Sequence, residues 1–142
     1  MTSPMTDPDV LILKDELDDL RESLSYWRRE AAGLEDLAEE MRKVAADLRR
    51  EVDILGDPFI PIRRLHNTST WEGNAARQSR QRLDTNEGRF RGATRSIEGL
   101  AASLSADAGT TSSRAVRARR EESAYFRQVV DIELELGLFD HI

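Results

Sequence analysis

The chain has 142 residues, of which 34% are charged and 6% aromatic, with four prolines and no cysteine. Without cysteine, disulfides and thiolate metal sites are excluded, and the shortage of large apolar side chains argues against a thick globular core. The sequence has no run of 18 apolar residues, so we expect no membrane-spanning helix. This composition is typical of long helices that pack along thin seams, and we predict a single all-α domain.

The formal net charge of −6 is unevenly distributed. Residues 1–57 carry 8 basic and 16 acidic side chains, whereas residues 58–142 carry 13 basic and 11 acidic ones. Opposite charge in the two halves favours a chain that folds back on itself. The arginine-rich span 63–95 could contact phosphates of a nucleic acid, but we favour ion pairs with the acidic first half.

A first long helix is predicted over about residues 8–55. Asp7 and Pro8 form a typical helix start, and Gly56, Asp57 and Pro58 form a typical stop. Between them, apolar residues follow one another at alternating steps of three and four, which is the heptad pattern of a coiled-coil seam. The seam residues are Val10, Leu13, Leu17, Leu20, Leu24, Trp27, Ala31, Leu34, Ala38, Met41, Ala45, Leu48, Val52 and Leu55.

The middle of this seam is where we expect a partner helix to bind. Three alanines at one heptad position permit close approach, and Leu37 and Val44 widen the apolar stripe beyond two positions. A wide stripe favours a bundle of three or four helices over a bare two-stranded coil. The predicted partner-contact residues here are Leu34, Leu37, Met41, Val44 and Leu48.

Residues 56–69 are predicted to connect two helices. Phe59, Ile60, Ile62 and Leu65 give this connection apolar anchors, which we expect to pack over the end of the hairpin. The sequence from Ser69 to Glu72 is a capping box, so we predict a second helix over about residues 70–108.

The polar, small-residue stretch 107–113 predicts a break, followed by a third helical segment over about residues 113–136. The predicted fold is therefore an antiparallel helical hairpin with coiled-coil packing and an additional C-terminal helical segment. Whether the second and third segments are continuous is left open by the sequence.

The order of a long helix, a connection, and then Thr70-Trp71-Glu72-Gly73-Asn74-Ala75-Ala76 at the start of a second helix resembles the WXG family of small helical hairpins. Members of that family are substrates of type VII (ESX-like) secretion systems in actinobacteria and related Gram-positive bacteria. The resemblance covers roughly residues 10–110 and implies that Trp71 and Gly73 form part of a surface for a partner or for the secretion machine.

Two features depart from the family pattern. The chain is longer than the typical member, and Tyr125 is followed four positions later by Val129 instead of the acidic residue of the family's secretion signal. The resemblance then implies either a secreted substrate or an adaptor whose export depends on a partner. Residues 1–8 do not form a Sec signal peptide, so we expect a cytoplasmic location before any export.

Catalytic and cofactor sites are not predicted. His66 and His141 lie in the connection and near the C-terminus, and neither has a second ligand at metal spacing. We find no nucleophile–base pair and no glycine-rich phosphate loop, so we expect no metal, no cofactor and no enzymatic activity.

Three functional hypotheses remain. The first is an interaction protein that pairs with itself, with a homologous small helical protein or with a larger secreted substrate, in a type VII secretion context. The second is a coiled-coil structural component of a larger assembly such as a phage particle. The third, a nucleic-acid-binding protein, rests only on the arginine-rich middle of the chain.

Overall fold

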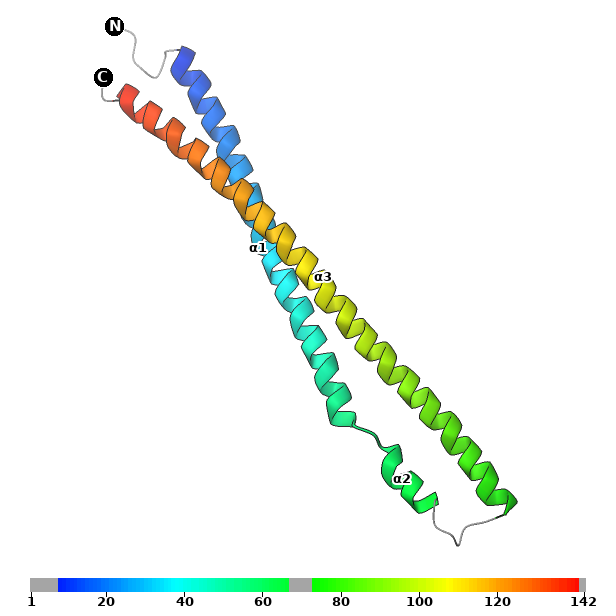
Figure 1. The fold of residues 1–142 in the computed structure, drawn as a ribbon. Coiled ribbons are helices and arrows are strands. Elements are labelled where there is room, and N and C mark those ends of the chain that lie inside the picture. The colour runs from blue at the N-terminus through cyan, green and yellow to red at the C-terminus, as the bar shows by residue number, and fades with distance from the viewer. Residues whose placement is uncertain (1–7, 67–72, 141–142) are drawn as a thin grey trace. The chain divides into compact units, whose positions relative to one another are not determined.

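The computed structural model describes residues 8–66 and 73–140, and it confirms the predicted all-α helical hairpin (Figure 1). The described residues form three helices: α1 over Pro8–Leu55, α2 over Phe59–His66 and α3 over Asn74–Asp140. No strand occurs within these ranges.

Helix α1 has the predicted bounds, although the capping residue Asp7 lies outside the described part of the chain. The helix ends at Leu55, and Gly56 directly after it adopts a left-handed backbone conformation with φ of 56°. The Gly56 N–H donates to the carbonyl of Val52 at 3.2 Å, so one of the last carbonyls of the helix is satisfied. A glycine here avoids the steric cost that a side chain would bring.

Helix α2 occupies the segment that was predicted to be an irregular connection. The carboxylate of Asp57 accepts the backbone N–H of Phe59 at 2.9 Å and so caps the first turn. Pro61 is the third residue of the helix, where its missing N–H breaks no intrahelical hydrogen bond.

Only one of the four predicted apolar anchors of this segment packs as expected. The ring of Phe59 lies against that of Phe90 on α3, with centroids 5.6 Å apart. Ile60, Ile62 and Leu65 are exposed, so the prediction that they pack over the hairpin end is wrong. An eight-residue helix places only one side on its neighbour, and Phe59 and Arg63 occupy that side of α2.

Helix α3 begins at Asn74 instead of at about residue 70. Gly73 precedes it with φ of 107°, a conformation that side chains disfavour, and its carbonyl accepts the N–H of Arg77 at 3.0 Å. The predicted capping box from Ser69 to Glu72, which includes Trp71, lies outside the described residues.

The sequence indicates a break or a weakening over residues 107–113 and leaves the continuity of the two segments open. No break occurs, because α3 runs through this stretch without interruption. Ala108, Thr111 and Ala115 are buried there, at steps of three and four. Packing against a second helix therefore outweighs the weak helix propensity of the serines, threonines and glycine.

Contacts divide the chain into two compact units. Unit 1 comprises Met1–Glu39 and Ala108–Ile142, and unit 2 comprises Glu40–Asp107. Both α1 and α3 contribute to each unit, and α2 belongs to unit 2.

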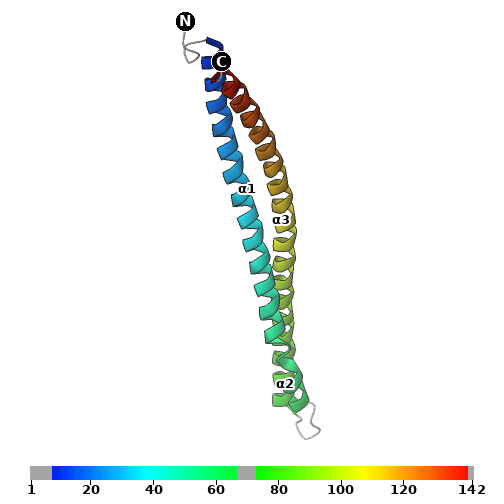
Figure 2. The ribbon, with the colours of Figure 1, turned by 90° about the vertical axis from the view of Figure 1, so that its left-hand side faces the viewer.

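In unit 1, α1 and α3 lie side by side and run in opposite directions (Figures 1 and 2). One buried cluster contains Leu17, Leu24, Val129 and Ile132. A second cluster contains Ala31, Leu34, Ala115 and Ala118, with Trp27 packed against it as predicted for a core position.

Unit 2 has a thinner apolar interior. Its buried apolar side chains, among the described residues, are Ala45, Ala76, Leu83 and Ala101. A carboxylate, Glu87, is also buried, and the ring contact between Phe59 and Phe90 joins α2 to α3.

Candidate protein-interaction surface

The predicted partner-contact residues of α1 fall into two groups. Leu34 is buried against Ala115 and Ala118, while Met41 and Leu48 are half-buried. Leu34 therefore already has a partner helix within the chain. Leu37 and Val44 remain exposed, at 46% and 45% of their surface.

The other predicted site residues are scattered. Tyr125 packs on the buried cluster of unit 1 that contains Val129 and Ile132. Gly73 is exposed, and a Cβ built on it meets no atom within 4 Å, so its positive φ and not crowding explains the glycine. Trp71 lies outside the described residues, and its role in a binding surface stays a prediction.

One flank of the seam in unit 1, which we call the paired flank, is closed by ion pairs between α1 and α3. Arg21 contacts Glu133 at 3.0 Å, and Arg28 contacts Glu122 at 3.3 Å. On the same flank, Arg119 donates to Glu35 at 2.7 Å. On α1, the charged residue of each pair directly follows a seam residue: Arg21 follows Leu20, Arg28 follows Trp27 and Glu35 follows Leu34.

These ion pairs change the titration of two groups on the paired flank. Hydrogen bonds from Arg119 and then from Arg28 lower the pKa of Glu122 below its ordinary value. Hydrogen bonds to the carboxylates of Glu122 and then of Glu35 raise the pKa of Arg119. Glu122 therefore stays ionised into moderately acidic solution and continues to hold both arginines.

The opposite side of the seam in unit 1, which we call the acidic flank, has no such pairing. Over residues 16–30 of α1 and 121–135 of α3, its charged positions are those that directly precede a seam position. They are Glu16, Asp19, Glu30, Glu121, Asp131 and Glu135. None of these six carboxylates forms an ion pair with another described residue.

A shallow hollow adjoins the acidic flank on α1. Asp19, Glu22, Ser23, Tyr26 and Trp27 line it. The ring of Tyr26 is half exposed and meets that of Trp27 edge to face, with centroids 5.2 Å apart. The flank thus combines negative charge with an aromatic ring.

On the flank of unit 2 that corresponds to the acidic flank, exposed apolar side chains stand among the acidic residues Glu40, Asp47 and Glu51, and we call it the apolar flank. Val44 and Leu100 occupy it, because each directly precedes a seam alanine, Ala45 or Ala101. Across the seam, Arg49 donates to the hydroxyl of Ser105 at 3.1 Å. Val44 and Leu100 are 45% and 53% exposed, so this side of unit 2 offers uncovered apolar surface.

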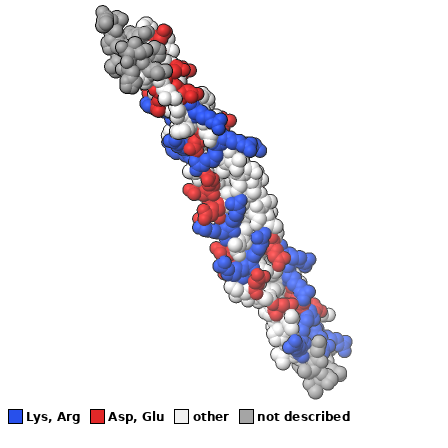
Figure 3. Space-filling view, turned by 60° about the vertical axis from the view of Figure 1, so that its left-hand side comes forward, with Lys and Arg blue, Asp and Glu red and all other residues white. Residues whose placement is uncertain are grey.

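Charged side chains of both signs alternate over the face of the molecule drawn in Figure 3, with uncharged surface beside them. The predicted ion pairs within the arginine-rich span are found in part. Arg91 pairs with Asp57 of the acidic first half and also with Glu87, whereas Arg63 pairs with Asp84 and Glu87 of the second half.

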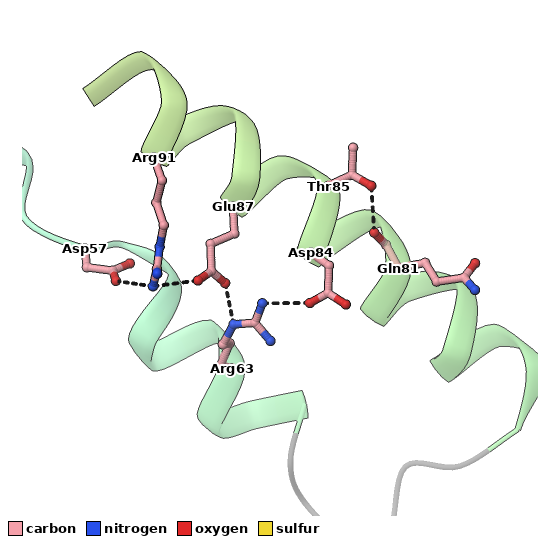
Figure 4. A network of polar contacts seen from close by, with 7 residues as sticks. All are labelled: Asp57, Arg63, Gln81, Asp84, Thr85, Glu87 and Arg91. Atoms are coloured by element: carbon pink, nitrogen blue, oxygen red, sulfur yellow. Dashed lines mark hydrogen bonds and ion pairs between the residues drawn. The ribbon is translucent and has the colours of Figure 1, made fainter. Parts of the chain in front are cut away.

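A polar network joins α2 to α3 in unit 2 (Figure 4). Arg63 of α2 contacts both Asp84, at 2.7 Å, and Glu87. Arg91 contacts Glu87 at 2.7 Å and Asp57 at 3.4 Å. Glu87 thus sits between two arginines, which compensates for the burial of its charge. Glu87 stands four residues after Leu83 and three before Phe90, which is the spacing of seam residues, so its burial could have been predicted from the sequence.

No helix in the described ranges has an apolar stretch that could cross a bilayer. Among the same residues, no group of three or more histidine, aspartate or glutamate side chains is arranged to hold a metal ion. Comparison with protein-family models, with curated proteins and with solved structures finds no match to this chain. The surfaces described above therefore carry the functional argument.

Proposed function

We propose that the chain is a non-enzymatic helical interaction protein that binds a second helical chain along the apolar flank of unit 2. The observation that carries this proposal is the exposure of Val44 and Leu100 beside a seam whose other side is closed by Arg49 and Ser105. A helix laid over the apolar flank would bury both side chains and convert the pair of helices into a bundle.

The proposed context is type VII secretion. Its support is the resemblance of residues 10–110 to the WXG hairpins, together with the helix start at Asn74 directly after Trp71-x-Gly73. The partner is then a second copy, a homologous small helical protein or a larger secreted substrate. Because Tyr125 is not followed by an acidic residue at the family spacing, an adaptor role is proposed ahead of direct secretion.

The binding surface is tested by replacing Val44 and Leu100 together with aspartate. The tagged chain is purified from its host, the bound protein is identified, and the complex is rebuilt from purified components. We expect Val44→Asp/Leu100→Asp to lose binding while its circular dichroism stays unchanged, because two charges would be buried in the new contact.

A matched control replaces Val116 and Leu134, which are exposed on α3 in unit 1, with aspartate. This control has the same two residue types and the same change of charge, and it should bind normally. A fully helical monomer that retains no host protein would overturn the proposal, as would equal binding by both double variants.

The secretion context is tested separately. Culture medium is compared between the host and a strain that lacks its type VII secretion ATPase. We expect the bound partner, the chain itself or both to disappear from the medium of the mutant. Unchanged export would remove the secretion context and leave the binding surface to its own test.

A further inference from the structure

Two surfaces of this chain carry unpaired charge of opposite sign. The first is the acidic flank of unit 1, where six carboxylates have no ion-pair partner among the described residues. Arg21, Arg28 and Arg119 lie on the paired flank. Arg114 and Arg117 lie on the same side as the six carboxylates, because they directly precede Ala115 and Ala118, and the acidic flank keeps an excess of negative charge. Like charges gathered on one flank repel one another and favour a basic partner.

The second surface is the outer face of α3 in unit 2, which we call the arginine face. Arg82 and Arg89 lie seven residues apart and are both exposed. Gln78, Gln81, Thr85 and Asn86 share a shallow hollow with them, and no carboxylate lines it. The acidic residues of this part of α3 that are nearest in sequence, Asp84 and Glu87, already contact Arg63.

Neither arginine forms an ion pair with a described residue. Arg91, in contrast, holds Asp57 and Glu87. The charges of the arginine face therefore make no ion pair that would stabilise the described fold.

We propose that the arginine face of one chain docks on the acidic flank of a second copy, so that the protein associates with itself through complementary charge. Each chain carries both surfaces, so one copy can supply the basic surface and another copy the acidic one. This inference rests on the proposed function only in that both assign the chain to helix–helix binding, and it uses different residues.

The spacing of the charges suits two helices side by side. Arg82 and Arg89 are seven residues apart, or roughly 10 Å along a helix. Glu16 and Glu30 on α1, and Glu121 and Glu135 on α3, are each separated by two such intervals, with Ser23 and Gln128 at the positions between them, so carboxylates recur at every second heptad on both helices of the flank. Exposed Tyr26 beside Asp19 adds a ring on which a guanidinium can stack.

A second copy is favoured over a nucleic acid. Two unpaired arginines in one hollow would neutralise few phosphates, and the acidic flank would repel a polyanion. The same flank gives the arginine face a complementary protein surface without any further component.

The test compares self-association of purified full-length variants by light scattering at low and high salt. The native chain is expected to dimerise at low ionic strength and to dissociate as salt screens the charges. Both Arg82→Glu/Arg89→Glu and Glu16→Lys/Glu30→Lys should raise the dimer dissociation constant by about tenfold or more.

An equimolar mixture of these two variants is the decisive sample. Within either variant alone, the two surfaces carry charge of the same sign and repel each other. In the mixture, the reversed, acidic face of the first variant meets the reversed, basic flank of the second, and the native arginine face of the second meets the native acidic flank of the first. We expect the mixture to recover the native mass. The matched control Arg120→Glu/Arg127→Glu, with the same spacing on exposed positions of unit 1, should dimerise like the native chain.

A monomer at low salt, or a dimer insensitive to both reversals, would overturn the inference. So would binding of a short DNA duplex that requires Arg82 and Arg89 in a chain that does not self-associate. If the chain is monomeric but Val44→Asp/Leu100→Asp still loses a host partner, this inference fails and the proposed function stands.

Discussion

Units 1 and 2 are built from the same two long helices but are held together differently. Unit 1 buries aliphatic side chains of α1 and α3 in two clusters, around Leu24 and around Leu34. Unit 2 buries mainly alanines and Leu83, and it adds a ring contact and a network of charges around Glu87.

This difference suggests that unit 1 provides most of the stability of the hairpin, whereas unit 2 is the part available for binding. Apolar burial contributes roughly 25 cal/mol for each Å² removed from water, whereas exposed ion pairs contribute little. We therefore expect unit 1 to hold the hairpin together and unit 2 to open locally at lower cost. The exposed apolar residues Val44, Leu100 and Ile60 also belong to unit 2, where rearrangement around a partner is easier.

The largest expected effect comes from placing a charge in the interior of unit 1. Leu34→Asp puts a carboxylate between Ala115 and Ala118, where no basic group is buried to receive it. We expect the free energy of unfolding to fall by about 3 kcal/mol or more. Thermal unfolding followed by circular dichroism measures this change.

Leu37→Asp is the control for this substitution, because it makes the same replacement three residues further on at an exposed position. Its melting temperature should remain close to that of the native chain. Equal destabilisation by the two variants would mean that the seam of unit 1 is not buried.

An intermediate effect is expected from breaking the network of unit 2. Glu87→Ala leaves Arg63 and Arg91 without their shared carboxylate and should destabilise the contact of α2 with α3 by about 1 to 2 kcal/mol. Hydrogen exchange should become faster in α2 and in residues 74–95, with unit 1 unchanged. Glu98→Ala, at an exposed position of α3, is the control, and uniform acceleration in both units would contradict the comparison.

The smallest expected effect is on the pH dependence of stability in acidic solution. The pKa of Glu122 is lower in the folded chain than in an unfolded one, so its contribution to stability is present above its ordinary value of about 4.3 and is lost as pH falls through the folded value. Between about pH 5 and pH 3, Glu122→Gln should lose less stability than the native chain does. Parallel pH profiles for the two proteins would show that this group does not contribute.

The heptad pattern was sufficient to predict α1, because fourteen seam residues and a Gly-Asp-Pro stop all agree with one another. The pattern in α3 was obscured over residues 107–113, where small polar side chains resemble a loop although Ala108 and Ala115 keep the period. Helix α2 was missed because its stability depends on long-range contacts of Phe59 and Arg63, which local propensity does not contain.

The exposure of the residues beside the seam could be predicted from heptad position, whereas their role in binding stays a prediction. Leu37 and Val44 stand beside the seam and are exposed, while Leu34 stands in it and is buried. The exposure of Leu100 on α3 becomes visible only when the position of α1 is known. The acidic flank could not be recognised because its carboxylates come from two helices far apart in sequence.

The alanines of unit 1 have a consequence for how the two helices find their alignment. Ala31 and Ala38 on α1, and Ala108 and Ala115 on α3, are buried and recur every seven residues. Sliding α3 by one heptad in one direction would put Ala108 in the place of Ala115 and Ala101 in the place of Ala108, so these alanine contacts alone do not reject that shifted alignment. The same slide would place Ser112 opposite Glu35 in place of Arg119. The ion pairs of the paired flank, weak as stabilising contacts, thus oppose a shifted alignment that the alanine contacts alone would accept.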